Sequence, residues 1–109
     1  MVDLLNKKCA PCESIGSPLG EEEVKKYMAE IGEGWNVKDK RISKKFKFNN
    51  FKESIGFINK IAVIAEEENH HPDIEIHYNR VIITLWTHAI GGLSENDFIL
   101  GSKIDNLRS

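Results

Sequence analysis

The chain has little of what marks an exported, membrane-spanning or nucleic-acid-binding protein. Its 109 residues include two cysteines and three prolines. No apolar run approaches the roughly 20 residues that a membrane span needs. Basic and acidic residues are interspersed and leave a formal net charge of −2, so no basic stripe indicates nucleic acid. The first residues lack the apolar core and the cleavage site of a signal peptide. We therefore expect one cytoplasmic domain, with neither nucleic acid nor membrane as a partner.

The two cysteines form a Cys-x-x-Cys pair, Cys9 and Cys12, near the N-terminus. A redox pair of the thioredoxin type would need a surrounding strand–helix–strand pattern, and none is visible. A zinc site would need two further ligands, and the chain has no second cysteine pair. We therefore predict an irregular arm over residues 1–18, followed by a single domain over residues 19–109.

Hydrophobic periodicity predicts a helix and a hairpin in the first half of the domain. An apolar stripe at helical spacing predicts a helix from Gly20 to Ile31, which glycines then end. The alternating residues that follow predict two strands joined by a tight turn at Asp39–Lys40. This turn places Val37 opposite Ile42, so that the apolar faces of the two strands agree.

A longer helix is predicted from Phe51 to Asn69, because Asn50 and Glu53 have the spacing of a capping box. Its apolar residues fall into two stripes. One stripe would cover the sheet, and the other would pack against another subunit of a homo-oligomer. We expect the inward stripe to be Phe51, Ile55, Ile58, Ala62 and Ala65, and the outward stripe to be Phe57, Ile61 and Ile64.

Pro72 should end this helix, and a second hairpin should follow it. We expect strands over residues 73–78 and 81–88, joined by the two-residue turn Asn79–Arg80. Extended back along the first of these strands, the same register would bring His88 beside the adjacent residues 70 and 71.

A last helix should begin after Ser94, since Ser94 and Asp97 have the spacing of a second capping box. The predicted order is therefore α-β-β-α-β-β-α. This order indicates an α+β fold, in which a four-stranded antiparallel sheet is covered on one face by three helices.

Histidines gather where these elements end. Glu66 and His70 are four residues apart at the end of a helix, so they should share a face. The negative end of the helix dipole favours a protonated imidazole at His70 and His71. His88 would arrive from the neighbouring strand. Imidazoles grouped with a carboxylate suit general acid–base catalysis near neutral pH.

These residues could also bind a metal or have only structural roles. Three histidines and a glutamate could bind zinc, but adjacent histidines point in different directions and no His-Glu-x-x-His spacing is present, so we expect no metal site. Asp97 could serve only as the acid of its capping box. Trp35 and Trp86 could be core or sheet-face aromatics. His77 alternates with apolar strand positions, so it should face away from the core and be exposed or at an interface.

The pattern Glu66-x-x-x-His70-His71-Pro72, followed at fixed distances by Tyr78, His88 and Asp97, resembles the signature of the pterin-4a-carbinolamine dehydratases. Supporting phrases are Gly34-Trp35, Tyr78-Asn79-Arg80-Val81, Ile83-Thr84-Leu85-Trp86-Thr87-His88 and Gly92-Leu93-Ser94-Glu95-x-Asp97. The resemblance covers about residues 19–107. Asn69 departs from the pattern, since familiar members have an aspartate before the paired histidines.

The resemblance implies a cofactor-free dehydratase. It would remove water from a 4a-hydroxytetrahydropterin, which pterin-dependent aromatic amino acid hydroxylases release, and so give quinonoid dihydropterin. His70 and His88 would be the acid–base pair, and His71 would position the pterin. The substrate-binding residues implied by the resemblance are Glu66, Trp35, Asn69, Thr87 and Asp97.

The family also implies partners. Its members form dimers or tetramers, in line with a central helix that has two apolar stripes. Animal relatives also act as dimerisation partners of a homeodomain transcription factor, through the same helices. A protein-binding module that uses the central helix is therefore the alternative function.

Overall fold

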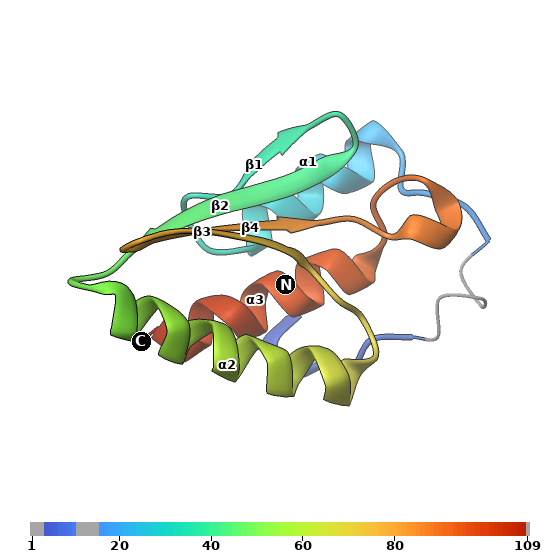
Figure 1. Ribbon diagram of the computed structural model, residues 1–109. Coiled ribbons are helices and arrows are strands. Elements are labelled where there is room, and N and C mark those ends of the chain that lie inside the picture. Colours follow the sequence, from blue (N-terminus) through green and yellow to red (C-terminus); the bar gives the residue numbers. More distant parts are fainter. Residues whose placement is uncertain (1–3, 11–15, 109) are drawn as a thin grey trace.

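The computed structural model describes residues 4–10 and 16–108, in which a four-stranded antiparallel sheet carries helices on one face (Figure 1). The elements are η1 Leu4–Asn6, α1 Glu21–Glu30, β1 Asn36–Lys38, β2 Arg41–Lys47, α2 Phe51–Glu68, β3 Asp73–His77, β4 Arg80–Leu85, η3 His88–Ile90 and α3 Glu95–Arg108. The α+β class and the predicted order of helices and strands are confirmed. Among the described residues, no helix has the length and apolar character to cross a membrane.

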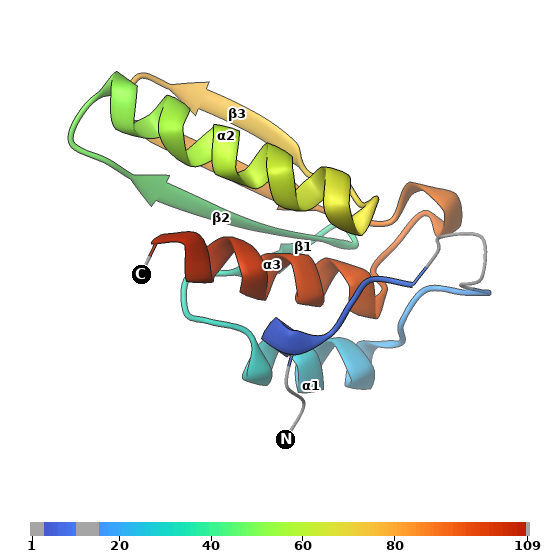
Figure 2. The same ribbon diagram turned by 90° about the horizontal axis from the view of Figure 1, so that it is seen from below.

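The strands lie in the order β1-β2-β4-β3, so β1 and β3 are the edges of the sheet. Seen from the helical side, α3 lies between α1 and α2 (Figure 2). The core fills the space between this helical layer and β2 and β4. Its fully buried side chains include Ile42, Ile61, Val81, Ile83, Leu85, Phe98, Leu100 and Ile104.

The first hairpin matches its prediction. Val37 pairs with Ile42, and Lys38 pairs with Arg41. The turn residues Asp39 and Lys40 have φ values of 51° and 61°. Two positive φ values in a two-residue turn match the right-handed twist of the strands that it joins.

The second hairpin has a different register from the predicted one. Ile76 pairs with Val81, so the turn is formed by Tyr78 and Asn79 rather than by Asn79 and Arg80. The reason is that Asn79 is held by the end of β2. The amide of Phe48 donates to the carbonyl of Asn79, and the Asn79 side chain donates to the carbonyl of Phe48. Because the shift is two residues, the same side chains still face the core.

The second helix begins as predicted, because the Asn50 side chain accepts a hydrogen bond of 2.9 Å from the backbone of Glu53. The prediction for its two apolar stripes was wrong. Phe57 and Ile61 are buried against the sheet. The ring of Phe57 lies 4.8 Å from that of Phe46, centroid to centroid. Both stripes are apolar, so periodicity alone could not tell which one these sheet aromatics would face. The exposed large apolar residues of α2 are Phe51, Ile55 and Val63.

The described part of the N-terminal arm lies against the domain. Residues 4–6 form one turn of 3₁₀ helix, and the side chain of Leu4 is buried in the core. Cys12, the second cysteine of the predicted Cys-x-x-Cys arm, lies outside the described residues. Cys9 is described as a free cysteine of intermediate exposure.

Candidate active site

The end of α2 sets the direction of the two adjacent histidines. The helix ends at Glu68, and Asn69 takes a left-handed conformation with φ 52° and ψ 41°. The amides of both Asn69 and His70 donate to the carbonyl of Ala65. An asparagine tolerates this conformation better than most residues, which makes it a suitable helix cap. The cap takes His70 and His71 out of helical spacing, so that the two side chains diverge.

His70 turns into the protein and meets Asp97. Its Nε2 lies 2.6 Å from Oδ1 of Asp97, and the two side chains are 5% and 0% exposed. A carboxylate only accepts hydrogen bonds, so Nε2 carries the hydrogen. A buried carboxylate that accepts from an imidazole fixes both the tautomer and the orientation of the ring.

Asp97 is itself held by the residues that precede α3. Its Oδ2 accepts hydrogen bonds of 3.0 Å from the backbone amide of Ser94 and from Oγ1 of Thr87. The hydroxyls of Ser94 and Thr87 are 2.7 Å apart. The predicted capping contact is therefore present, and the same carboxylate also binds a histidine. Sequence reasoning treated these as alternative roles, but the two oxygens of one carboxylate serve both.

His71 turns outward and pairs with Glu66. The sequence had placed Glu66 on the same face as His70, by helical spacing. The prediction fails because α2 ends before either histidine, so that His71 and not His70 comes back over Glu66. Both side chains of this pair are well exposed.

His88 belongs to η3 and not to the end of a strand, because β4 stops at Leu85. Its ring stacks on Trp86 with 4.0 Å between the ring centroids. The guanidinium of Arg41 lies over the same indole at 4.3 Å, and the indole nitrogen donates to Asp73. Sequence reasoning missed Arg41 and Asp73. The pairing of Ile42 with Leu85 puts Arg41 opposite Trp86, a position that needs the order of β2 and β4 in the sheet.

The end of α2, which precedes His70 and His71, and η3, which contains His88, lie at the same end of the sheet, to the right in Figure 1. Asp73 starts β3 and pairs with Thr84 near the end of β4, so residues 70 and 71 lie near the chain that leaves β4. The observed register places position 71 opposite 86, so the predicted pairing of 71 with 88 was wrong. His70 and His88 are linked indirectly. Asp97 binds both His70 and Thr87, and His88 follows Thr87 in the chain.

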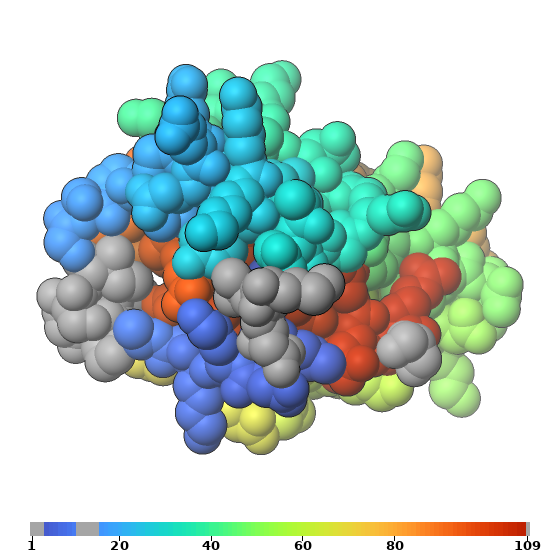
Figure 3. All heavy atoms as spheres, turned by 180° about the vertical axis from the view of Figure 1, so that it is seen from behind, coloured from blue at the N-terminus to red at the C-terminus, as the bar shows by residue number. Residues whose placement is uncertain are grey.

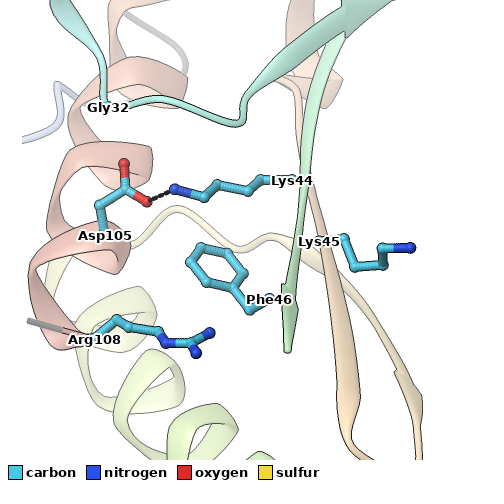
Figure 4. A pocket seen from close by; sticks show the side chains of 6 residues that line it. All are labelled: Gly32, Lys44, Lys45, Phe46, Asp105 and Arg108. Carbon is cyan, nitrogen blue, oxygen red and sulfur yellow. Dashed lines mark hydrogen bonds and ion pairs between the residues drawn. The ribbon is translucent and has the colours of Figure 1, made fainter. Parts of the chain in front are cut away.

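The described contacts of Trp35 lie away from the three histidines. Trp35 is buried, and its indole nitrogen donates to Asp105 at 2.9 Å. Asp105 also accepts from Lys44, across a cavity of about 390 Å³ (Figure 4). Asp97 and Asp105 are about 12 Å apart along α3 at 1.5 Å per residue. The contacts of Trp35 thus belong to the far half of α3 and not to the histidine end.

Metal binding has no geometric support in the described residues. Within residues 4–10 and 16–108, no group of three or more histidine, cysteine, aspartate and glutamate side chains is placed to hold a metal ion. His77 is exposed, as predicted, and lies 3.5 Å from Glu75 on its own strand.

The comparisons with known proteins agree with this fold. Residues 17–107 match the family described as pterin 4 alpha carbinolamine dehydratase. A protein of Nitrosospira multiformis, named "putative pterin-4-alpha-carbinolamine dehydratase", is 48% identical over 105 residues, which are 96% of this chain and 92% of that protein. A protein of the same name from Alkaliphilus metalliredigens is 44% identical over 100% of this chain and 99% of its own length.

Two solved structures are also similar. One, described as a transcriptional coactivator/pterin dehydratase from Brucella melitensis, is 33% identical, with a TM-score of 0.80 over 85% of this chain and 100% of that chain. The other is described as a pterin dehydratase-like RuBisCO assembly factor. It is 26% identical, with a TM-score of 0.57 over 67% of this chain and 84% of its own. The fold and the site thus define an α+β domain with a buried imidazole–carboxylate pair at one end of its sheet. The chain belongs to the pterin-4-alpha-carbinolamine dehydratase family.

Proposed function

We propose that the protein is a hydro-lyase that dehydrates 4a-hydroxytetrahydropterin to quinonoid dihydropterin by histidine acid–base catalysis, without a cofactor. The observation that carries the proposal is the buried pair of His70 and Asp97 at the end of the sheet where His71 and His88 also lie. Membership of the family supplies the substrate class.

The reaction needs two proton transfers. The 4a-hydroxyl leaves as water once a proton is delivered to its oxygen, and the C–O bond breaks. The proton on ring nitrogen N5 is removed, and its electron pair forms the new double bond between N5 and C4a. Two imidazoles in opposite protonation states perform both steps near neutral pH. The acid ends neutral and the base ends protonated, so proton exchange with solvent resets the two imidazoles before the next turnover.

We assign the acid–base pair to His70 and His88. Asp97 holds the hydrogen on Nε2 of His70 and so fixes the ring in one tautomer and orientation. The stack on Trp86 fixes the plane of the His88 ring. We propose that His71 and Glu66 contact the ring edge of a bound pterin, which their exposure to solvent supports. Asn69 caps α2, and we propose that its role in the site is to set the direction of His70 and His71.

Burial changes the roles of two residues that the resemblance had assigned to substrate binding. Thr87 and Asp97 are both 0% exposed and bonded to each other. We therefore propose that they position His70 rather than touch the pterin. Trp35 has a comparable structural role, beside Asp105, in the described contacts.

A second candidate, a protein-binding module, is favoured by one observation. Val63 on α2 is 59% exposed, and Tyr78 beyond the edge strand β3 is 65% exposed. With Phe51, which stacks on Tyr78, and Ile55, these residues give α2 and the edge of the sheet an apolar outer side. We propose that this side holds the subunits of a homo-oligomer together, and that binding another protein there is the alternative function.

The test is the rate of 4a-hydroxytetrahydropterin dehydration with purified, metal-free protein. We expect acceleration by the wild type and a loss of about 100-fold or more in His70→Ala and in His88→Ala. His77→Ala is the matched control, since His77 is an exposed histidine on β3, and it should keep the wild-type rate. A folded wild type that gives no acceleration would refute the dehydratase proposal and favour the protein-binding function. Activity that appears only with added zinc would refute the metal-free mechanism.

Coupling to a source of the substrate can be tested in the same assay. An aromatic amino acid hydroxylase releases the 4a-hydroxytetrahydropterin, so we propose a functional link to such an enzyme rather than a bound complex. The dehydratase should speed cofactor turnover when it is added to a hydroxylase at catalytic amounts. His70→Ala should not.

A further inference from the structure

The segment of residues 4–10 precedes the region that matches the family, which begins at residue 17. In the structure this segment, here called the N-terminal strap, runs along α3 (Figure 2). Its first residue, Leu4, is buried in the core and anchors it. From behind, its dark blue atoms lie between the red and orange atoms of α3 and the yellow end of α2 (Figure 3). The strap therefore reaches the two helix ends that carry His70 and Asp97.

The strap binds α3 next to Asp97. The amide of Ala10 donates to Oδ1 of Asn96 at 2.9 Å, and Nδ2 of Asn96 donates back to the carbonyl of Ala10 at 2.8 Å. This reciprocal pair satisfies both polar groups of the Asn96 amide, which is only 2% exposed. Asn96 is the residue before Asp97, in the first turn of α3. The strap at Ala10 is thus bonded to the residue that precedes the carboxylate holding His70.

The strap also binds α2 just before His70. The amide of Cys9 donates to Oε1 of Glu68 at 2.8 Å. The other oxygen of Glu68 lies 3.6 Å from Nζ of Lys103 on α3, and the Glu68 side chain is 10% exposed. Glu68 is the last residue of α2, two positions before His70. Two neighbouring strap residues therefore tie together the ends from which the two members of the buried pair emerge.

The thiol of Cys9 adds a weak contact to this arrangement, since its Sγ donates to the carbonyl of Asn96 at 3.7 Å. Burial, followed by the charge and hydrogen bond of Glu68, raises the pKa of Cys9 to about 12. Only a thiolate is a strong nucleophile or metal ligand, so a thiol held protonated is inert at neutral pH. The backbone of Cys9 and Ala10 makes the shorter connecting hydrogen bonds, and the protonated sulfur adds the longer one to Asn96.

We propose that the N-terminal strap positions the His70–Asp97 pair, with Glu68 and Asn96 as the positioning residues through which it acts. The inference rests on the proposed dehydration for its catalytic meaning. Catalytic groups lose about 100-fold in rate when they are misplaced by about 1 Å, so a brace on both sides of the pair has a large effect without touching the substrate. The strap should therefore govern kcat and leave KM nearly unchanged.

The test uses the full chain with Asn96→Ala and Glu68→Ala, each of which removes one side of the connection. The Glu68→Gln variant keeps an acceptor for the Cys9 amide, and should restore most of what Glu68→Ala loses. Asn36→Ala is the matched control, since Asn36 also hydrogen-bonds to a backbone carbonyl, that of Gly34, on an exposed strand away from the strap. We expect kcat to fall about tenfold in both alanine variants, with KM within about twofold of the wild type.

A second readout follows the pair itself by proton NMR. The hydrogen that His70 donates to Asp97 is buried, so it should give a downfield signal in slow exchange with water that is absent in His70→Ala. We expect this signal to broaden or vanish in Asn96→Ala and Glu68→Ala while circular dichroism shows a folded chain. An unchanged signal in both folded variants would overturn the proposal. A lost signal with wild-type kcat would overturn its catalytic part. If the wild type does not dehydrate the pterin, the proposed function fails, and the NMR signal still decides whether the strap holds the pair.

Discussion

His70 and Asp97 are 27 positions apart in the sequence, and their side chains meet at 2.6 Å with almost no contact with water. Asp97 also accepts from the backbone of Ser94, so the carboxylate that helps to start α3 also fixes the imidazole. The beginning of a helix and the orientation of a proposed catalytic group therefore depend on one side chain. Changes at Asp97 should affect stability and activity together.

The first prediction concerns Asp97→Asn, which keeps the size of the side chain and removes its charge. We expect the free energy of unfolding to fall by roughly 2–3 kcal/mol, because hydrogen bonds to a charged group contribute about 1.5–3 kcal/mol. The dehydration rate should fall by about 10–100-fold, as it does when a carboxylate that orients a functional histidine is removed. Urea unfolding and the dehydration assay measure the two effects. Asp39→Asn is the control, since an asparagine suits the positive φ of that turn residue. Wild-type stability in Asp97→Asn would contradict this account.

The second prediction concerns the stack beneath His88. Trp86→Ala removes the indole that lies 4.0 Å from the His88 ring and beneath Arg41. An exposed imidazole without this surface samples several rotamers, so kcat should fall by about tenfold. Trp86→Phe keeps an aromatic face, loses only the hydrogen bond to Asp73, and should retain most of the activity. Equal rates for the alanine and wild-type proteins would show that the stack does not position His88.

The third prediction compares two helical glycines. A Cβ added at Gly101 would lie 2.7 Å from Cδ1 of Ile31 and 3.3 Å from the Trp35 ring, so Gly101→Ala should overpack the contact between α1 and α3. We expect it to cost about 1–3 kcal/mol of unfolding free energy. A Cβ at Gly56 meets nothing within 4 Å. Gly56→Ala should therefore stabilise α2 by up to about 1 kcal/mol. Thermal unfolding of both variants tests the pair, and a stabilised Gly101→Ala would contradict the packing.

Local chemistry made much of the fold predictable from the sequence. The caps at Asn50 and Ser94 and the turn at Asp39 and Lys40 depend on neighbouring residues, and each forms as expected. The signals that failed depend on distant contacts. Asn79 suits a positive φ, but its bonds to Phe48 move the turn by one residue, and no local rule contains Phe48.

The candidate site was predictable in composition and not in geometry. The predicted elements placed His70, His71 and His88 at one end of the sheet, as a single cluster. The left-handed Asn69 separates His70 from His71, and the early end of β4 puts His88 on Trp86 instead. Helical spacing cannot foresee a cap that interrupts it.

The last prediction is a dependence of stability on pH that originates at Cys9. Burial and the neighbouring Glu68 raise the pKa of Cys9 from 9.0 to about 12. In the unfolded chain this thiol loses its proton near pH 9.0, whereas the native chain keeps it up to about pH 12. The native state therefore binds more protons than the unfolded state between these values, and the free energy of unfolding must fall as the pH rises through them. Below about pH 9 the contribution is complete.

Urea unfolding at about pH 8 and about pH 10.5 measures this loss, in a Cys12→Ser background that leaves Cys9 as the single thiol. The pKa of Tyr27 is also raised to about 12, by burial and by its hydrogen bond to Glu95, so part of the alkaline loss will come from Tyr27. The variant that also carries Cys9→Ala isolates the thiol, because it keeps Tyr27 and has no proton to release at position 9. It should lose less stability between the two pH values than the Cys12→Ser protein does. Equal losses would mean that Cys9 is not held protonated, and hence that the strap does not bury it in solution.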